Sequence, residues 1–224
     1  MVSGSGRTTR AALVDIDGTR VGSNYQHALA WFRAMRRHGS TCEIRVLHHL
    51  VGMGGDQLVT AAAGEDVERR HGDALREAEA AIFREVIDEV TVLPGARRLL
   101  ETLAARARAV VLSSSAKPDD AEHYVDLMDA RGLVDGWTTS EDVEATKPAP
   151  DLIQAGLERA GGGPALMIGD STWDCRAAAR AGVPTVAVLT GGYCREELLE
   201  AGAAAVFDTP GEAAEGIAEG DLLA

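Results

Sequence analysis

Cysteine is scarce in this sequence, and long apolar runs are missing. The three cysteines, Cys42, Cys175 and Cys194, are odd in number and widely spaced, which argues against a disulfide framework or a cysteine metal site and predicts reduced thiols. No apolar run approaches the roughly 20 residues that a membrane helix needs, and the polar start, residues 1–6, is not a signal peptide. We therefore expect a cytoplasmic protein without a membrane partner.

Positive charge is also in short supply. The 224 residues include 35 acidic and 22 basic side chains, and the formal net charge of −13 argues against nucleic acid as a partner. Among the basic residues, only Lys117 and Lys147 are lysines. A chain that otherwise uses arginine keeps lysine where a compact point charge is needed, and we apply this interpretation to Lys147 but not to Lys117. The alternative for Lys147 is a solvated loop residue.

What the chain does have is an alternation of short apolar runs with helical patterns. Its 46% hydrophobic and 25% charged residues are typical of a globular protein, and its length suits one domain with an insertion. Repeated strand–helix units predict an α/β fold with a doubly wound parallel sheet, a Rossmann-like core over residues 1–20 and 92–224. The expected strands cover residues 11–14, 109–112, 137–139, 165–168, 184–189 and 204–207.

Residues 21–91 show no strand pattern and are interpreted as an inserted α-helical cap domain. Asn24 is in position to cap the first helix, and Gly72 is expected to interrupt the last. Residues 52–55 contain three glycines and predict a flexible loop that can approach a ligand closely. The expected helices cover residues 24–38, 44–51 and 65–89.

The first strand ends in two carboxylates one residue apart. Asp15 and Asp17 leave an extended chain on the same side, at the strand end where open α/β sheets bind ligands. Two like charges about 4 Å apart repel by about 4 kcal/mol at an effective dielectric of about 20. Either one carboxylate is protonated or a cation lies between them. The alternative is that Asp-x-Asp-Gly is only a polar turn.

Further polar residues follow the other expected strands. In a parallel sheet these strand ends share one edge, so side chains far apart in sequence converge there. Carboxylate oxygens suit Mg²⁺, whereas serine and lysine suit phosphate oxygens. The converging residues are Asp15, Asp17, the serines at 113–115, Lys147 and Asp170.

Four short segments that contain these residues resemble, in their order along the chain, the motifs of the haloacid dehalogenase-like hydrolases. The resemblance covers nearly the whole chain. The helical insertion between the first two motifs is similar to the cap of the phosphoglycolate-phosphatase-like and β-phosphoglucomutase-like branch. The four segments are Asp15-Ile16-Asp17-Gly18-Thr19, a serine after the second strand, Lys147-Pro148, and Gly169-Asp170-Ser171 with Asp174.

The resemblance implies a role for each motif. Asp15 is implied as the nucleophile that forms an aspartyl-phosphate, and Asp17 as the acid that protonates the leaving oxygen and then the base for water. Mg²⁺ is implied to be held by Asp15, the main-chain carbonyl of Asp17, and Asp170. Lys147 is implied to contact both the nucleophile and the phosphate.

Three serines compete for the second motif. We favour Ser114 as the phosphate contact, with Ser113 second and Ser115 as a further candidate, because relatives often place one small residue between the apolar run and the hydroxyl. Asp174 is expected to support the metal site, or to form only a capping box with Ser171.

Other positions depart from the family pattern or have an open role. Arg20 and Gly22 stand where relatives usually carry leucine and aspartate, which removes no catalytic group but bears on cap closure and substrate choice. Asp142 either supports Lys147 or the metal site, or begins a turn. His27 in the cap is not named as a site residue, because such histidines are more often structural.

The sequence thus predicts an Mg²⁺-dependent phosphatase that acts on a small phosphorylated metabolite. A β-phosphoglucomutase-like phosphomutase is the nearest alternative, because it uses the same pair of aspartates. A catalytically silent binding module is the second alternative, and the intact set of Asp15, Asp17, Lys147 and Asp170 counts against it. The protein is expected to be a monomer or a homodimer.

Overall fold

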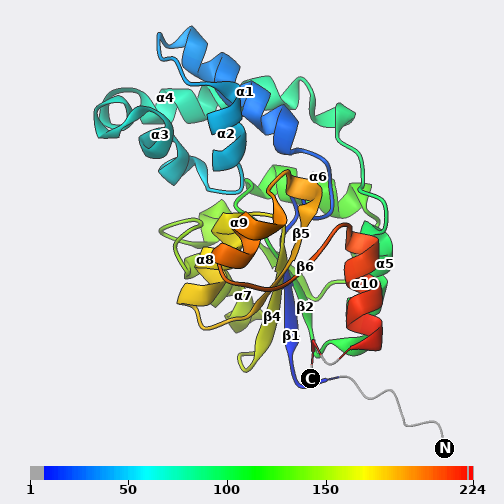
Figure 1. Cartoon of the computed structure of the whole chain (residues 1–224). Coiled ribbons are helices and arrows are strands. Elements are labelled where there is room, and N and C mark those ends of the chain that lie inside the picture. The colour runs from blue at the N-terminus through cyan, green and yellow to red at the C-terminus, as the bar shows by residue number, and fades with distance from the viewer. Residues whose placement is uncertain (1–7, 221, 224) are drawn as a thin grey trace, which may run out of the picture.

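A parallel sheet forms the centre of the molecule (Figure 1). The computed structural model describes residues 8–220, 222 and 223, so the polar start of the chain lies outside the described residues. Within this part of the chain the sheet has six strands in the order β3-β2-β1-β4-β5-β6, which confirms the predicted fold class. The strands are β1 (Ala11–Val14), β2 (Val110–Ser113), β3 (Gly136–Thr138), β4 (Ala165–Gly169), β5 (Thr185–Val188) and β6 (Ala203–Phe207).

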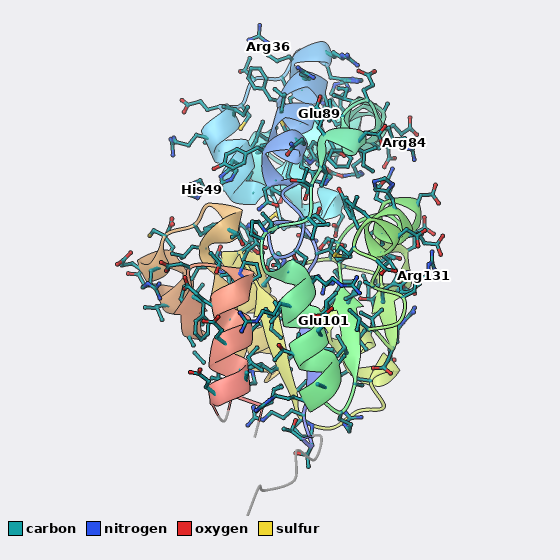
Figure 2. All side chains as sticks on the ribbon, turned by 90° about the vertical axis from the view of Figure 1, so that its right-hand side faces the viewer. Arg36, His49, Arg84, Glu89, Glu101 and Arg131 are labelled. Carbon is teal, nitrogen blue, oxygen red and sulfur yellow. The ribbon has the colours of Figure 1, made fainter. Side chains whose placement is uncertain are left out.

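Helices cover both faces of the sheet, and alternate residues of β1 point to opposite layers. Leu13 belongs to the apolar cluster that includes residues of α7 (Asp151–Arg159) and α8 (Thr172–Arg180). Val14 belongs to the larger cluster, which includes residues of α5 (Ala96–Arg106) and α10 (Pro210–Glu219). Figure 2 shows α5 and α10 side by side on this face. Burial on both faces explains why β1 is a continuous apolar run.

The remaining core helices connect the strands. The one after β2 begins at Pro118 as expected, because proline suits the first turn of a helix. The two short 3₁₀ helices lie after β3 and after β5. These elements are α6 (Pro118–Leu127), η2 (Ser140–Asp142), η3 (Leu189–Gly191) and α9 (Arg195–Glu200).

A helical cap between β1 and β2 lies over the carboxyl ends of the strands (Figure 1). Its own core is formed by large apolar side chains that include Trp31, Leu58 and Phe83. None of the helices among residues 8–220 has the length and apolar character needed to cross a membrane. The cap elements are α1 (Asn24–Arg37), α2 (Ile44–Leu50), α3 (Gly55–Ala63), α4 (Glu65–Arg84) and η1 (Ile87–Glu89).

Two details of the cap differ from the sequence prediction. Gly55 begins α3 instead of ending a loop, because burial of Leu58 and Val59 anchors this helix despite the poor helix propensity of glycine. The long helix runs through Gly72 without a break and ends at Arg84. The Glu68–Arg76 ion pair passes Gly72 so closely that a Cβ there would lie 2.4 Å from a Glu68 oxygen.

The two connections between cap and core lie side by side. Val21 forms an antiparallel bridge with Val92, and the Leu93 amide donates to the Arg20 carbonyl at 2.8 Å. The Gly22 amide donates to the Thr91 carbonyl at 2.9 Å. These contacts fall beside the domain limits expected at 20/21 and 91/92, which stay a prediction.

Arg20 occupies this junction with a fully buried side chain. None of its three guanidinium nitrogens has a hydrogen-bond partner among the residues whose positions are described. Burial lowers the pKa of Arg20 to about 9, against the opposing effect of the Asp15 charge. A buried charged group without hydrogen bonds destabilises a fold, so we expect Arg20 to lower the stability of this one.

We expect Arg20→Leu to raise the free energy of unfolding by about 1–3 kcal/mol, because it removes an unpaired buried charge and keeps apolar volume. Urea denaturation of the wild type and the variant measures the change. Arg33→Leu, at an exposed position of α1, is the matched control and should leave stability unchanged. If the Arg20→Leu protein is less stable than the wild type, the prediction is wrong, and the charge of the Arg20 guanidinium is compensated within the fold.

Candidate active site

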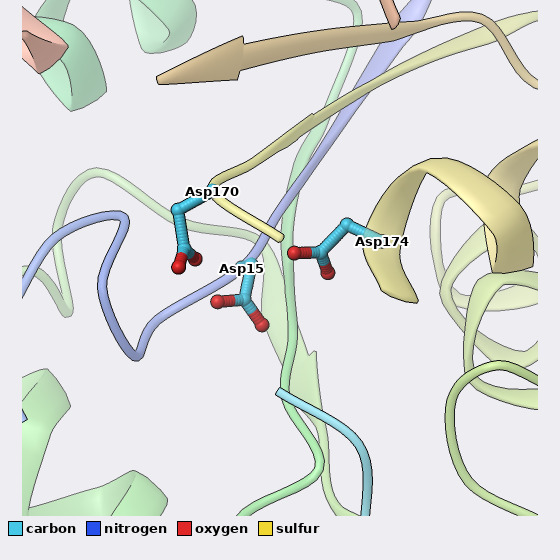
Figure 3. A group of neighbouring side chains, drawn as sticks. All are labelled: Asp15, Asp170 and Asp174. Carbon is cyan, nitrogen blue, oxygen red and sulfur yellow. The ribbon is translucent and has the colours of Figure 1, made fainter. Parts of the chain in front are cut away.

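Three buried aspartates lie close together at the β1–β4 boundary, where the order of the strands in the sheet reverses. Asp15 follows β1 and Asp170 follows β4, and these two strands are neighbours. Asp174 lies in the first turn of α8. Carboxylate oxygens of the three residues all lie within 4.8 Å of one another (Figure 3). This boundary, where the strand order reverses, is the place where doubly wound sheets bind ligands.

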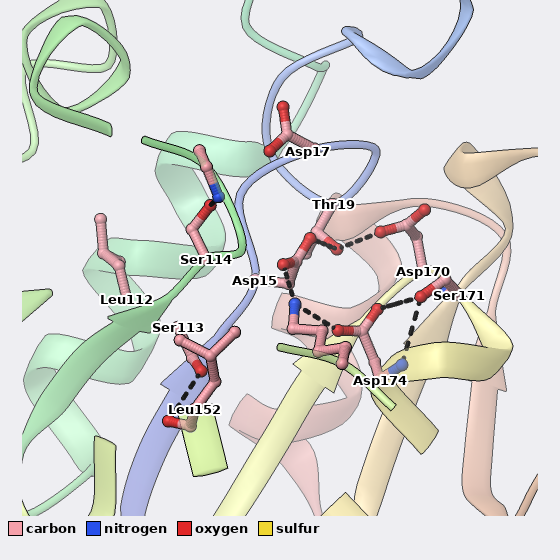
Figure 4. Close-up of polar contacts among 12 residues, drawn as sticks. Asp15, Asp17, Thr19, Leu112, Ser113, Ser114, Leu152, Asp170, Ser171 and Asp174 are labelled. Carbon is pink, nitrogen blue, oxygen red and sulfur yellow. Dashed lines mark hydrogen bonds and ion pairs between the residues drawn. The ribbon is translucent and has the colours of Figure 1, made fainter. Parts of the chain in front are cut away.

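Lys147 lies inside this group and has no exposed surface. Its ammonium forms ion pairs with Asp15 and, at 2.7 Å, with Asp174 (Figure 4). Burial lowers the pKa of Lys147, but the charges of Asp15 and Asp174 outweigh burial and hold that pKa above its ordinary value. Lys147 therefore remains a cation in the site, and a solvated position for this lysine is wrong.

The carboxylates outnumber the cation, and their pKa values reflect it. Burial, with the charges of Asp174 and Asp17, raises the pKa of Asp15 to about 7, although Lys147 opposes the shift. Burial and the charges of Asp15 and Asp174 raise the pKa of Asp170 well above its ordinary value. At neutral pH the site therefore favours an added proton or cation.

Asp170 is held by donors that arrive from the first motif and the cap. The Thr19 hydroxyl donates to one carboxylate oxygen at 2.8 Å, and the Asn24 amide donates to the other at 3.0 Å. The prediction that Asn24 caps α1 is wrong. Ser23 is the N-cap residue, and the Asn24 side chain instead donates to Asp170. A Cβ at Gly18 would lie 2.3 Å from Asp170, so this glycine allows the chain to approach the carboxylate.

The Asp17 carboxylate turns away from the aspartate group toward the cap. It accepts a hydrogen bond from the Ser23 hydroxyl, and His27 Nε2 lies 3.6 Å from one oxygen. The other ring nitrogen of His27 is 2.9 Å from Glu79, and the ring stacks on Phe83. Sequence reasoning set His27 aside; its spacing of four residues from Trp31, which shares the pocket, was the available signal.

The charges of Asp17 and His27 stabilise each other. Burial opposes the ionised form of Asp17, but hydrogen bonding to His27, the His27 charge and the Ser23 hydroxyl together lower its pKa. Burial also opposes the charged form of His27, but hydrogen bonds and charges of Asp17 and Glu79 raise its pKa to about 10. A proton is thus held on His27, beside Asp17, at neutral pH.

The three serines after β2 have different environments. The Ser113 hydroxyl donates to the Leu152 carbonyl at 3.3 Å and is directed into the helix layer, away from the site. The Ser114 hydroxyl accepts from the Ala116 amide at 3.0 Å (Figure 4). Ser115 lines the pocket beside Asp15, and its hydroxyl is buried without a partner among the residues described. Ser114 therefore stays a prediction, with Ser115 as the serine that faces the pocket.

Two further aspartates have defined local contacts. Asp174 forms the capping box with Ser171, whose hydroxyl accepts from the Asp174 amide at 3.2 Å, and also pairs with Lys147. Asp174 is therefore a helix cap that also lies beside Asp15 and Asp170, and its support of a metal site stays a prediction. Asp142 forms a capping box with Thr139 and pairs with Arg159 at 2.6 Å, so it belongs to a turn.

A cavity of about 260 Å³ lies between the cap and the core above these residues. Asp15, Asp17 and Ser115 line its core side, and His27, Trp31 and Arg76 line its cap side. Asp56 at the start of α3 accepts hydrogen bonds from the backbone amide, at 3.2 Å, and the hydroxyl of Thr146, the residue before Lys147. The cap is thus closed against the loop that carries the buried lysine.

Comparisons with known proteins agree with this arrangement. A family model described as haloacid dehalogenase-like hydrolase matches residues 9–182. The chain is 30% identical over 198 residues to a validoxylamine A 7′-phosphate phosphatase of Streptomyces hygroscopicus, covering 86% of this chain and 91% of that relative. It is 31% identical over 213 residues to a phosphoglycolate phosphatase of Rhodospirillum rubrum, covering 89% of this chain and 87% of the relative.

Solved structures show the same fold. A hydrolase from Pseudomonas syringae has a TM-score of 0.86 at 29% identity, covering 94% of this chain and 98% of that one. A protein described as a putative β-phosphoglucomutase from Bacteroides vulgatus has a TM-score of 0.82 at 22% identity, covering 96% of this chain and 89% of that one.

We expect Lys147→Met to lower the free energy of unfolding by about 3–5 kcal/mol at neutral pH, because it leaves Asp15 and Asp174 buried without their cation. Chemical denaturation of metal-free protein measures the loss. The other lysine supplies the control, since Lys117→Met alters an exposed side chain and should leave stability unchanged. Equal stabilities of the two variants would contradict this account of the buried charges.

Proposed function

Because this chain belongs to the haloacid dehalogenase-like hydrolase family, we propose that it is a phosphatase that hydrolyses the phosphoric monoester of a small metabolite. The observation that carries the proposal is the convergence of Asp15, Lys147 and Asp170 at the β1–β4 boundary, beneath the pocket between cap and core. The phosphatases among the sequence relatives support the same reaction class.

In the proposed reaction, Asp15 acts as the nucleophile. One of its carboxylate oxygens forms a bond to phosphorus, and the bond from phosphorus to the alcohol oxygen breaks, which leaves an aspartyl-phosphate. Lys147 holds the attacking carboxylate in place and offsets the charge of the phosphoryl oxygens. Either Ser114 or Ser115 would donate to a phosphoryl oxygen.

Asp17 carries the proton in both halves of the reaction. It gives a proton to the leaving alcohol oxygen, then takes one from the water that attacks phosphorus and releases phosphate from Asp15. At rest the proton lies on His27 and Asp17 is ionised, so the proton that Asp17 gives to the alcohol oxygen comes from His27, and the proton taken from water returns to His27. The closed cap excludes bulk water during the first step.

The donor set fits Mg²⁺. Asp15 and Asp170 offer buried carboxylate oxygens that lie within 4.8 Å of each other, and the surplus of negative charge at neutral pH favours a bound cation. These two carboxylates and the main-chain carbonyl of Asp17 would hold the ion, with Asp174 in support. Bound there, Mg²⁺ shields the phosphoryl charge so that an anion can attack an anion.

A phosphomutase remains the second candidate function, because solved structures of this fold include proteins described as β-phosphoglucomutases. Incubation with a hexose 1-phosphate separates the two reactions: a phosphatase releases inorganic phosphate, whereas a mutase forms the isomer without it. A silent binding module would do neither. The three cysteines form no disulfide with one another. The cytoplasmic location and the monomeric or homodimeric state stay expectations.

Asp15→Asn should lower phosphate release from p-nitrophenyl phosphate with Mg²⁺ by about a thousandfold or more, because an amide cannot form the aspartyl-phosphate. The near-identical shape should leave the fold intact, as circular dichroism would show. Asp88→Asn, at an exposed position of the cap, is the control and should keep wild-type turnover. Unchanged turnover by Asp15→Asn would end the proposal.

Stability without metal should fall as pH rises toward 8. The Asp15 pKa is raised from 3.8 to about 7 on folding, so the stability from this proton is present below pH 3.8 and lost as pH passes about 7. Mg²⁺ competes with that proton, so it should raise the melting temperature more at pH 8 than at pH 6. At a Mg²⁺ concentration of a hundred times Kd, binding should add about 2.7 kcal/mol to the free energy of unfolding.

Thermal unfolding with EDTA and with Mg²⁺, at both pH values, measures this effect. Asp170→Asn should lose most of the Mg²⁺-dependent shift because it removes a proposed ligand. A shift of the same size in Asp170→Asn, or one independent of pH, would contradict the metal assignment.

A further inference from the structure

The lining of the pocket has more carboxylates than cations. Glu79 reaches it from α4, Asp120 from the first turn of α6, and Glu144 from the loop after η2. Asp56 also lines the pocket and is used in its bonds to Thr146. This is the region that the alcohol portion of a phosphate ester would occupy when the phosphate lies against Asp15.

The cations that line the pocket are mostly neutralised by other residues. Arg76 pairs with Glu68 at 2.8 Å and with Asp73 at 2.9 Å, and also donates to the Gly55 carbonyl at 3.1 Å. His27 is held between Asp17 and Glu79. Lys117 is exposed, and no ion pair of its ammonium is found among the residues that the structure describes. Because Lys117 also lines the pocket, it is the lining cation left without an ion pair among the described residues, and it stands against the carboxylates of Glu79, Asp120 and Glu144.

Asp120 is the carboxylate best placed to contact a substrate. It is partly buried and lines the pocket, and its side chain makes no hydrogen bond or ion pair with the rest of the chain as described. Burial, with the charges of Asp17 and Glu79, raises the pKa of Asp120, although His27 opposes the shift. A hydrogen-bond donor brought to Asp120 would relieve this repulsion, whereas a carboxylate would add to it.

We propose that Asp120 accepts hydrogen bonds from hydroxyl or ammonium groups on the alcohol portion of the substrate, so that the enzyme prefers phosphate esters of polyols or amino-polyols over esters that carry a carboxylate. The inference rests on the proposed phosphatase function. Asp120 is in this view a specificity-determining residue: it contacts the leaving alcohol, while Asp15 and Lys147 bind the phosphate that every substrate shares.

The wild-type enzyme with Mg²⁺ is assayed for phosphate release from sorbitol 6-phosphate, glucosamine 6-phosphate and 2-phosphoglycolate. We expect kcat/KM to be at least tenfold higher for each of the first two esters than for 2-phosphoglycolate. Similar values for the sorbitol and glucosamine esters would identify hydroxyls as the donors, and a further preference for glucosamine 6-phosphate would identify the ammonium group. A preference for 2-phosphoglycolate overturns the proposal.

Asp120→Ala tests the residue itself. It should lower the ratio of kcat/KM for the preferred ester to that for 2-phosphoglycolate by at least tenfold, since a hydrogen bond to a charged acceptor is lost. General damage to the fold would lower all values together and leave this ratio unchanged, which would overturn the assignment. Asp119→Ala, at the exposed neighbouring position outside the pocket, is the matched control and should keep the wild-type ratio.

Two further measurements keep the outcomes distinct. Asp120→Asn preserves the shape of the side chain and replaces the alanine variant if that protein does not fold. Hydrolysis of p-nitrophenyl phosphate by the wild type reports the basic phosphatase reaction. If this ester and the three others all release no phosphate, the phosphatase function fails; if it is hydrolysed but the expected preference is missing, only the role of Asp120 fails.

Discussion

The balance of charge around one buried lysine is the constraint on which the rest of the structure depends. Lys147 lies without solvent contact between Asp15 and Asp174, and Asp170 adds a third carboxylate nearby. Desolvated charges are tolerated only when opposite charges or hydrogen bonds compensate them. One lysine does not neutralise three carboxylates, so the site favours an added proton or cation. The excess of carboxylates over Lys147 in the folded protein is the feature that the proposed Mg²⁺ would balance.

Sheet topology brings these charges together. The reversal of strand order at the β1–β4 boundary makes neighbours of Asp15 and Asp170, which are more than 150 positions apart in the chain. Gly18 lets the first loop approach Asp170, and Thr19 and Asn24 supply its hydrogen bonds. Asn24 and His27 both come from the first helix of the cap, so the cap contributes directly to the geometry of the core carboxylates. Cap position and site geometry are therefore coupled through α1.

Local patterns predicted the core well and the cap less well. The strands were identified because buried parallel strands are continuous apolar runs bounded by turn residues. The third cap helix was missed because it begins within a glycine-rich segment, where burial of Leu58 outweighs propensity. Gly72 was expected to interrupt the last cap helix, but α4 runs through this position without a break. An ion pair between Glu68 and Arg76 passes over Gly72. For α3 a tertiary contact overrode the local preference, whereas at Gly72, which is buried, the ion pair lies within α4 itself.

The sequence by itself determined the α/β class, the family resemblance and the principal charged residues, because these depend on residue type, periodicity and the order of motifs along one chain. Only the tertiary structure decided which serine faces the pocket and that Asp142 belongs to a turn. It also decided that Arg20 is buried without hydrogen bonds to the described residues, and that His27 holds a proton beside Asp17. It also showed that Asp120 lines the pocket and forms no hydrogen bond or ion pair with the residues that the structure describes. The physical reason is that orientation, burial and pKa depend on neighbours from distant segments, and spacing along the chain carries no information about them.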